Sequence, residues 1–146
     1  MKKTSVIPAM TAVVFCMALA LGIGAAAPWL VKWFCGFRNI SDSVGDKILI
    51  SYYLCLVAVE FALINIFRLL VNIKRGDMFS RKNHVYMSLV AFCCLCVSAV
   101  TFVCGFLYMP MFFICAAMLF LFLIVRVVRM CFVAAAEIKE ENDYTV

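Results

Sequence analysis

Glu60 lies near the middle of an apolar run that extends over residues 48–70. A carboxylate at the centre of a bilayer is unfavourable by about 3 kcal/mol or more, so this side chain should stay protonated or face a partner inside the protein. Helical spacing places Tyr53 and Ile64 on its face. Two roles follow: a site that exchanges a proton or a cation, or a neutral acid that hydrogen-bonds to a neighbouring helix. The second role is favoured, because the chain has no second ionisable group deep in the bilayer with which Glu60 could form an exchange site.

Cys93 and Cys96 form a Cys-x-x-Cys pair, a spacing used by redox enzymes and zinc sites. No charged residue lies between Tyr86 and Pro110, and the chain has a single His. A reactive thiolate needs an electropositive, partly wet setting, and a thiol oxidoreductase needs a second pair carried on a loop. We therefore interpret most of the nine cysteines as small packing residues. We expect no catalytic residues, no metal and no cofactor.

The composition is that of an integral membrane protein. Hydrophobic residues make up 68% of the chain, charged residues make up 14%, and the mean hydropathy is +1.12. The 146 residues hold four spans of about 20 residues with short connections and no separate soluble domain. The net charge is +5, and the Lys and Arg residues cluster at the ends of the spans, where they meet anionic lipid headgroups and not nucleic acid.

We predict an all-α integral membrane bundle of four transmembrane helices that forms a single domain over residues 1–146. The predicted elements are spans at about 6–27, 48–70, 86–107 and 111–128, a basic hinge at 71–85 and a charged tail at 129–146. The first run also resembles a secretory signal that ends in Gly-Ala-Ala-Ala before Pro28, but its length favours an uncleaved span. Residues 28–47 are expected to form an interfacial loop, with Trp29 and Trp33 at headgroup level.

Two stripes of small residues predict where helices approach one another closely. In the first span Ala18, Gly22 and Ala26 recur every four residues, and this stripe should face protein. The third span carries a longer seam at spacings of three and four, formed by Ala91, Cys94, Ser98, Thr101 and Gly105. The uncharged segment 107–111 then predicts a tight turn, so that the third and fourth spans pack antiparallel.

The cations decide the expected orientation. With four spans both termini share a side, and that side would hold ten of the thirteen Lys and Arg residues. They are Lys2, Lys3, Arg68, Lys74, Arg75, Arg81, Lys82, Arg126, Arg129 and Lys139. The other side holds Lys32, Arg38 and Lys47. The positive-inside rule therefore places the termini and the hinge in the cytoplasm.

Two segments carry a resemblance to a known family. The hinge Leu-Leu-Val-Asn-Ile-Lys-Arg-Gly-Asp-Met-Phe (69–79), with Asn83 after it, and the ending Ala-Glu-Ile-Lys-Glu-Glu-Asn-Asp-Tyr-Thr-Val (136–146) resemble the YoaS-like family. This is a family of small four-span bacterial membrane proteins whose function is unknown. Its members more often end in Leu-Thr-Ile than in Tyr-Thr-Val. They are often encoded beside a Cro/CI-type regulator, so the resemblance implies a regulatory partner and no catalytic residues.

The hinge and the tail bring opposite charges to the predicted cytoplasmic face. The candidate interaction face consists of Lys74, Arg75, Phe79, Arg81, Lys82, Asn83, Glu137, Glu140, Glu141, Asn142 and Asp143. These charges could bind one another or a third molecule, whereas a solvated face that only fixes orientation explains them equally well.

We expect a non-enzymatic interaction or regulatory protein of the cytoplasmic membrane. The expected partners are the lipid bilayer together with a cytoplasmic regulator, another membrane protein or a second copy of the chain. Direct binding of nucleic acid is not expected. The alternative is a small proton-coupled transporter that uses Glu60, by fold-level analogy to four-span drug exporters.

Overall fold

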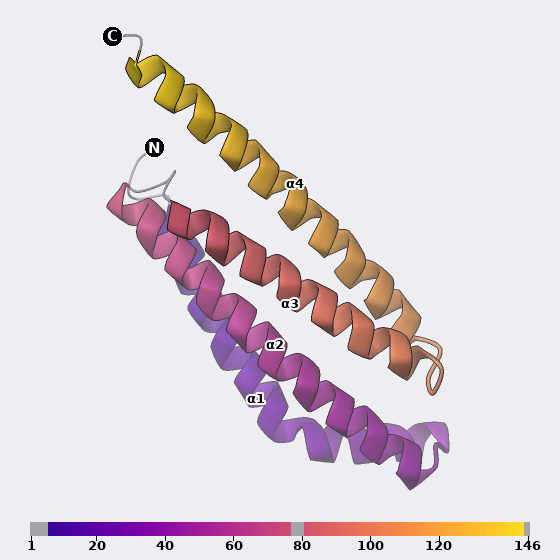
Figure 1. Cartoon of the computed structure of the whole chain (residues 1–146). Helices are drawn as coiled ribbons and strands as arrows, with labels where there is room; N and C mark the ends of the chain where they lie inside the picture. Colours follow the sequence, from indigo (N-terminus) through magenta and orange to yellow (C-terminus); the bar gives the residue numbers. More distant parts are fainter. Residues whose placement is uncertain (1–5, 77–80, 145–146) are drawn as a thin grey trace.

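The computed structural model consists of four long α-helices joined by short connections (Figure 1). They are α1 (Val6–Arg38), α2 (Asp42–Arg75), α3 (Arg81–Gly105) and α4 (Met111–Tyr144). The structure describes the backbone of residues 6–76 and 81–144, and the side chains of residues 6–76 and 82–138.

Each helix is long and apolar enough to cross a bilayer. Helices suit this environment because every backbone polar group must find its partner within the protein when no water is present. The 34 residues of α2 extend about 50 Å, which is well beyond a hydrocarbon core of about 30 Å. The chain is therefore a multi-pass membrane protein, and the predicted all-α fold is confirmed.

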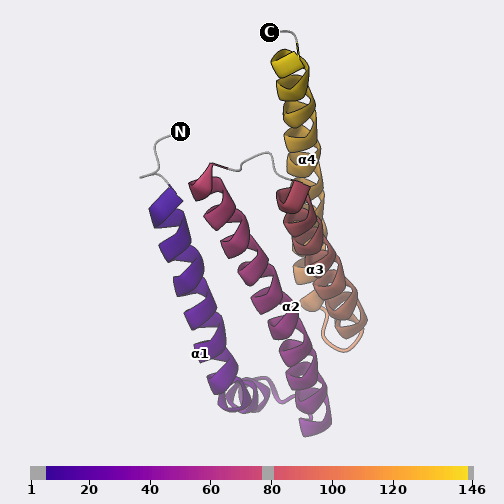
Figure 2. The ribbon, with the colours of Figure 1, turned by 60° about the vertical axis from the view of Figure 1, so that its left-hand side comes forward.

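The predicted loop over residues 28–47 is wrong. Helix α1 continues through Pro28 to Arg38, and only residues 39–41 connect it to α2. Figures 1 and 2 show that α1 bends sharply before it reaches α2. We attribute the bend to Pro28, because proline removes one hydrogen bond from a helix without preventing it from continuing. Trp29 and Trp33 are exposed on this outer segment, which suits indoles at headgroup level.

The helices pack in chain order, α1 on α2, α2 on α3 and α3 on α4, and form an open row (Figure 2). Helix α3 is the centre of this row. Half of its most apolar stretch is buried, against 6% for each of the other three helices. The outer faces of α1, α2 and α4 are left for lipid.

The small-residue seam predicted on α3 is confirmed. Its five members are all buried: Ala91, Cys94, Ser98, Thr101 and Gly105. The Ser98 hydroxyl donates to the backbone oxygen of Cys115 on α4 at 3.4 Å, and Gly105 lies directly against the ring of Phe112. The turn that includes Tyr108 reverses the chain between these contacts, so α3 and α4 pack antiparallel as expected.

The stripe predicted to face protein on α1 is on the wrong side of the helix. Ala18, Gly22 and Ala26 are exposed, and no atom of the described residues lies within 4 Å of where a Cβ on Gly22 would be. Helix α1 instead uses Gly24 and Ala27, which are buried against α2. A Cβ on Gly24 would come within 2.6 Å of the Leu56 side chain. Spacing alone suggested the wrong one of two small-residue stripes.

The contact of Gly105 with the Phe112 ring gives the first prediction. A Cβ at position 105 would lie 2.7 Å from the Phe112 ring, so Gly105→Ala should destabilise the fold by about 1–3 kcal/mol through overpacking. Gly22→Ala, which meets open space, should leave stability unchanged or slightly raised. Thermal unfolding in detergent, followed by circular dichroism, measures both. Equal melting temperatures for the two variants would contradict the described packing.

Candidate functional site

The start of α1, the end of α2, the start of α3 and the end of α4 lie at one end of the molecule (Figure 1). We call this the termini end. Among the described side chains, the cations of the termini end are Arg68, Lys74, Arg75, Lys82, Arg126 and Arg129. Those of the opposite end are Lys32, Arg38 and Lys47. The fold therefore keeps the two sets of charges apart, as the sequence predicted.

A side-chain hydrogen bond joins the last turns of α2 to the first turn of α3. The Asn72 side-chain amide donates to the Asn83 side-chain oxygen at 2.9 Å, and Asn83 is only 2% exposed. Gly76 ends α2 with a φ of 94°, a left-handed conformation that favours glycine, and its N–H bonds to the backbone oxygens of Asn72 and Ile73. Asn83 therefore supports the turn and is not part of the exposed candidate face.

Four members of the candidate interaction face have described, exposed side chains: Lys74, Arg75, Lys82 and Glu137. Six lie outside the described side chains, namely Phe79, Arg81, Glu140, Glu141, Asn142 and Asp143. The structure therefore places one described acid and three described bases of the predicted face at the termini end.

Helix α4 continues past the start of α3 at the termini end (Figures 1 and 2). Met130 and Ile138 are 70% and 61% exposed, and Ala134 between them is also exposed. We call Met130, Ala134 and Ile138 the α4 stripe. It is an apolar surface that begins at Met130, beside the start of α3, and continues onto the part of α4 beyond α3.

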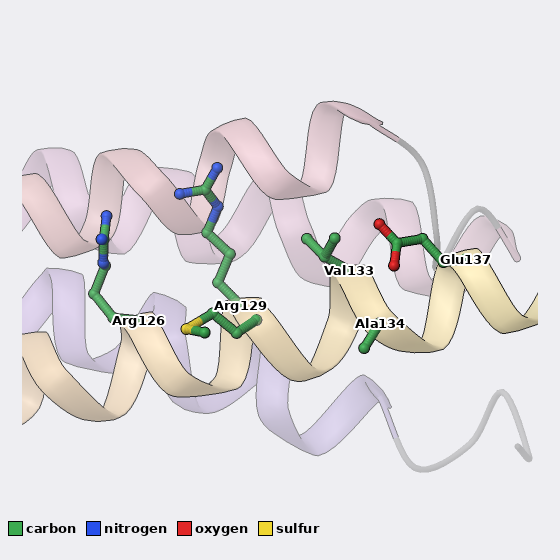
Figure 3. A pocket seen from close by; sticks show the side chains of 6 residues that line it. Arg126, Arg129, Val133, Ala134 and Glu137 are labelled. Carbon is green, nitrogen blue, oxygen red and sulfur yellow. The ribbon is translucent and has the colours of Figure 1, made fainter.

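A groove of about 370 Å³ follows the same part of α4 (Figure 3). It is lined by Arg126, Arg129, Met130, Val133, Ala134 and Glu137. Figure 3 shows the side chains of Arg126, Arg129 and Glu137 directed to the same side of the helix. The Arg126 guanidinium lies 5.9 Å from the centre of the Phe122 ring, one turn back. The groove is therefore basic at one end and acidic at the other.

A second groove of about 380 Å³ lies between α3 and α4, and sequence reasoning did not find it. Its walls are His84, Val85, Ser88 and Leu89 from α3 and Arg129 from α4. The Nδ1 atom of His84 and the Nε atom of Arg129 are buried without a hydrogen-bond partner among the described residues. The only sequence signal was the antiparallel hairpin, which brings residues 84 and 129 to the same level.

Glu60 lies on the side of α2 that faces α1. It is one turn beyond Leu56, which packs on Gly24, and two turns beyond Tyr53, whose hydroxyl donates to the Gly24 backbone oxygen at 3.2 Å. The Oε1 atom of Glu60 is buried and has no hydrogen-bond partner within the described part of the chain. The predicted bond from this oxygen to a neighbouring described helix is therefore missing. The nearby Asn65 amide, in contrast, donates to the Phe61 backbone oxygen at 2.7 Å.

Several of the cysteines act as packing or hydrogen-bonding residues. All nine are free thiols, and Cys93 is buried within the helix row. The Cys104 sulfur lies 2.8 Å from the Ser51 hydroxyl of α2, and the Cys115 sulfur of α4 lies 3.2 Å from the Ser98 hydroxyl. Over residues 6–76 and 82–138, no group of three or more His, Cys, Asp and Glu side chains could hold a metal ion.

A family model described as "Protein of unknown function (DUF2975)" matches residues 3–146. The chain belongs to the DUF2975 family. The match covers almost the whole length of the chain. The searches of curated proteins and of solved structures gave no match. Family membership assigns no activity.

Proposed function

We propose that this DUF2975 protein is a non-enzymatic interaction protein of the cytoplasmic membrane that binds a protein partner through the projecting part of α4. The observation that carries this proposal is the α4 stripe. An apolar face inside the bilayer is covered by lipid, but α4 extends past the start of α3, where the bundle ends. Ala134 and Ile138 are exposed on this projecting part, and Met130 is exposed where α4 leaves α3.

The spacing of the stripe suits a helical or grooved partner. Residues four apart form one face of a helix, and such anchors are the usual way in which an amphipathic helix binds a complementary groove. Charged residues lie at the same end of the molecule, with Glu137 on α4, Lys74 and Arg75 in the last turn of α2, and Lys82 in the first turn of α3. Charges at the rim of an apolar contact add specificity and speed association more than they add affinity. A cytoplasmic regulator, as the family resemblance implies, fits this description.

Orientation is the premise of the proposal and gives the second prediction. Because the cations gather at the termini end, a cytoplasmic reporter fused after Val146 should be active, and an extracytoplasmic reporter fused there should be silent. The same two reporters inserted at Ser41 should give the opposite result. Reversed activities at the two positions would contradict the proposed cytoplasmic side.

Site-specific photo-crosslinking in living cells provides the third prediction. A photoreactive residue at position 130 should form a discrete adduct with a protein partner. The same residue at Phe120, which is 65% exposed on the membrane-embedded part of α4, should not. Adding Ile138→Glu should reduce the adduct at least about tenfold, because a charge would be buried without a partner in the contact. Glu137→Gln, a neighbouring change that leaves the stripe apolar, should preserve most of the adduct.

An absent adduct at position 130, or an equal one at position 120, would contradict partner binding by the α4 stripe. An adduct whose only protein component is a second copy of the chain would identify the stripe as a self-association surface. In that case the partner would be a second copy of the chain, which the sequence analysis also allows, and not a cytoplasmic regulator.

The second candidate function is a small proton-coupled transporter, and one observation favours it. The Oε1 atom of Glu60 is buried without a partner among the described residues, so this oxygen has no structural bond that a coupling role would have to break. A neutral acid at this depth can release a proton only if water or a substrate reaches it. The contacts of Tyr53 and Leu56 with Gly24 hold α1 against the same face, which argues for the packing role.

Glu60→Gln provides the fourth prediction. Gln keeps the shape of a neutral acid but has no exchangeable carboxyl proton. The variant should match the wild type in abundance, in size-exclusion profile and in photo-crosslinking from position 130. Proteoliposomes that contain a pH-sensitive dye and are challenged with ethidium should show no proton flux with either protein. Ethidium-driven flux in the wild type that disappears in the Gln variant would establish the transporter instead.

A further inference from the structure

We propose that the groove between the termini end of α3 and α4 binds the phosphate group of an anionic phospholipid. The site consists of His84, Ser88 and Arg129, with Val85 and Leu89 as its apolar wall. It differs from the α4 stripe in place and in chemistry, and its occupant is a lipid of the surrounding bilayer and not a protein.

Buried donors without acceptors point to an acidic ligand. The Nε atom of Arg129 is buried and has no partner in the described part of the chain, although a guanidinium is charged and offers its N–H groups in a planar fork. A buried donor without an acceptor costs about 1–3 kcal/mol, and more when it is charged. A phosphate oxygen is an acceptor that fits this fork and forms short, charge-assisted bonds. The Ser88 hydroxyl and an imidazole nitrogen of His84 line the same groove and can contact the remaining oxygens.

The depth of the groove favours a lipid over a soluble anion. Arg129 lies 18 residues after Met111, the first residue of α4, which corresponds to about 27 Å along the helix axis. This is close to the thickness of the hydrocarbon core, about 30 Å, so we expect the guanidinium at the level of the lipid phosphates when the turn between α3 and α4 lies at the opposite membrane surface. On the α3 side Val85 is 54% exposed and borders the groove. A headgroup in the groove can therefore keep its acyl chains against the lipid-facing surface of α3.

The charges around the groove favour a lipid with a net negative charge. Arg126 lies one turn before Arg129 on α4 and shares its groove along the helix. Lys82 precedes His84 on α3 and carries an exposed cation. Glu137 is the acid of that α4 groove, but it lies eight residues from Arg129, about 12 Å along the axis. Basic pockets between helices at the headgroup level are a known setting for anionic lipids.

Arg68 provides the matched comparison. An arginine that merely extends its head group towards water keeps that group exposed and serves any anionic surface. Arg68 on α2 is such a residue: it is exposed. It is also at a comparable depth, because the bond between Asn72 and Asn83 aligns this part of α2 with the start of α3. If Arg129 acts as part of a built site, the two arginines must differ in lipid binding.

The experiment uses the purified full chain in dodecyl maltoside, titrated with phosphatidylglycerol or with phosphatidylcholine of the same acyl chains. Native mass spectrometry counts the bound lipid. The wild type should bind phosphatidylglycerol more tightly, Arg129→Gln should weaken that binding about tenfold through loss of charge-assisted bonds, and Arg129→Lys should retain part of it. Arg68→Gln should change binding less than about twofold, as expected for an exposed charge. Inorganic phosphate should not displace the lipid.

Equal losses in Arg129→Gln and Arg68→Gln would overturn the proposal, because they would show a general charge effect. Equal binding of the two lipids would also overturn it. Displacement of the lipid by millimolar inorganic phosphate would overturn it as well, because it would show that the groove binds a free anion. If Arg129→Gln aggregates, His84→Ala decides instead: unchanged phosphatidylglycerol binding would refute the site, and weakened binding would support it. The α4 stripe plays no part in these readouts, so the two proposals fail separately.

Discussion

Close packing on α3 is the constraint on which the rest of the structure depends. Lipid chains are as apolar as the helix surfaces, so helices in a membrane associate through van der Waals contact and hydrogen bonds between them. Helix α3 offers both. Its small side chains let α2 and α4 approach, and the contacts of Cys104 with Ser51 and of Ser98 with Cys115 join it to each neighbour. Helix α1 has no comparable place on α3 in the described part of the chain and is held by α2 through contacts such as Tyr53 with Gly24.

The sequence predicted the α3 seam correctly because five small residues recur at spacings of three and four along most of that span. The same reasoning failed on α1, where two small-residue stripes run side by side. Leu56 and Tyr53 on α2 decide between them by packing on Gly24, and that choice is a tertiary one. The loop expected after Pro28 failed for a local reason. Proline disfavours a helix interior, but one lost hydrogen bond was too small a cost to end α1.

The candidate site was predictable in its charges and not in its contacts. Runs of basic and acidic residues placed the hinge and the tail at one end, whereas Asn83 belonged to the interior because Asn72 reaches it across the connection. The pairing of His84 with Arg129 needs the register of two antiparallel helices. That register could have been estimated by counting equal distances from the turn at Tyr108, which places the two residues within about one helical turn of each other. Their burial required the structure.

The two proposed surfaces meet at a single residue, and this has a thermodynamic consequence. Arg129 lines the groove between α3 and α4 as well as the groove along α4, and Met130, the first residue of the α4 stripe, follows it directly. A lipid that holds Arg129 would fix the depth and the rotation at which α4 leaves the bilayer, and hence the face that the stripe presents. Binding free energies are reciprocal, so a partner that prefers the setting of α4 fixed by the lipid must raise the protein's affinity for that lipid by the factor by which the lipid raises the protein's affinity for the partner. Membrane composition would then enter partner binding through the geometry of one helix, without any lipid contact to the partner.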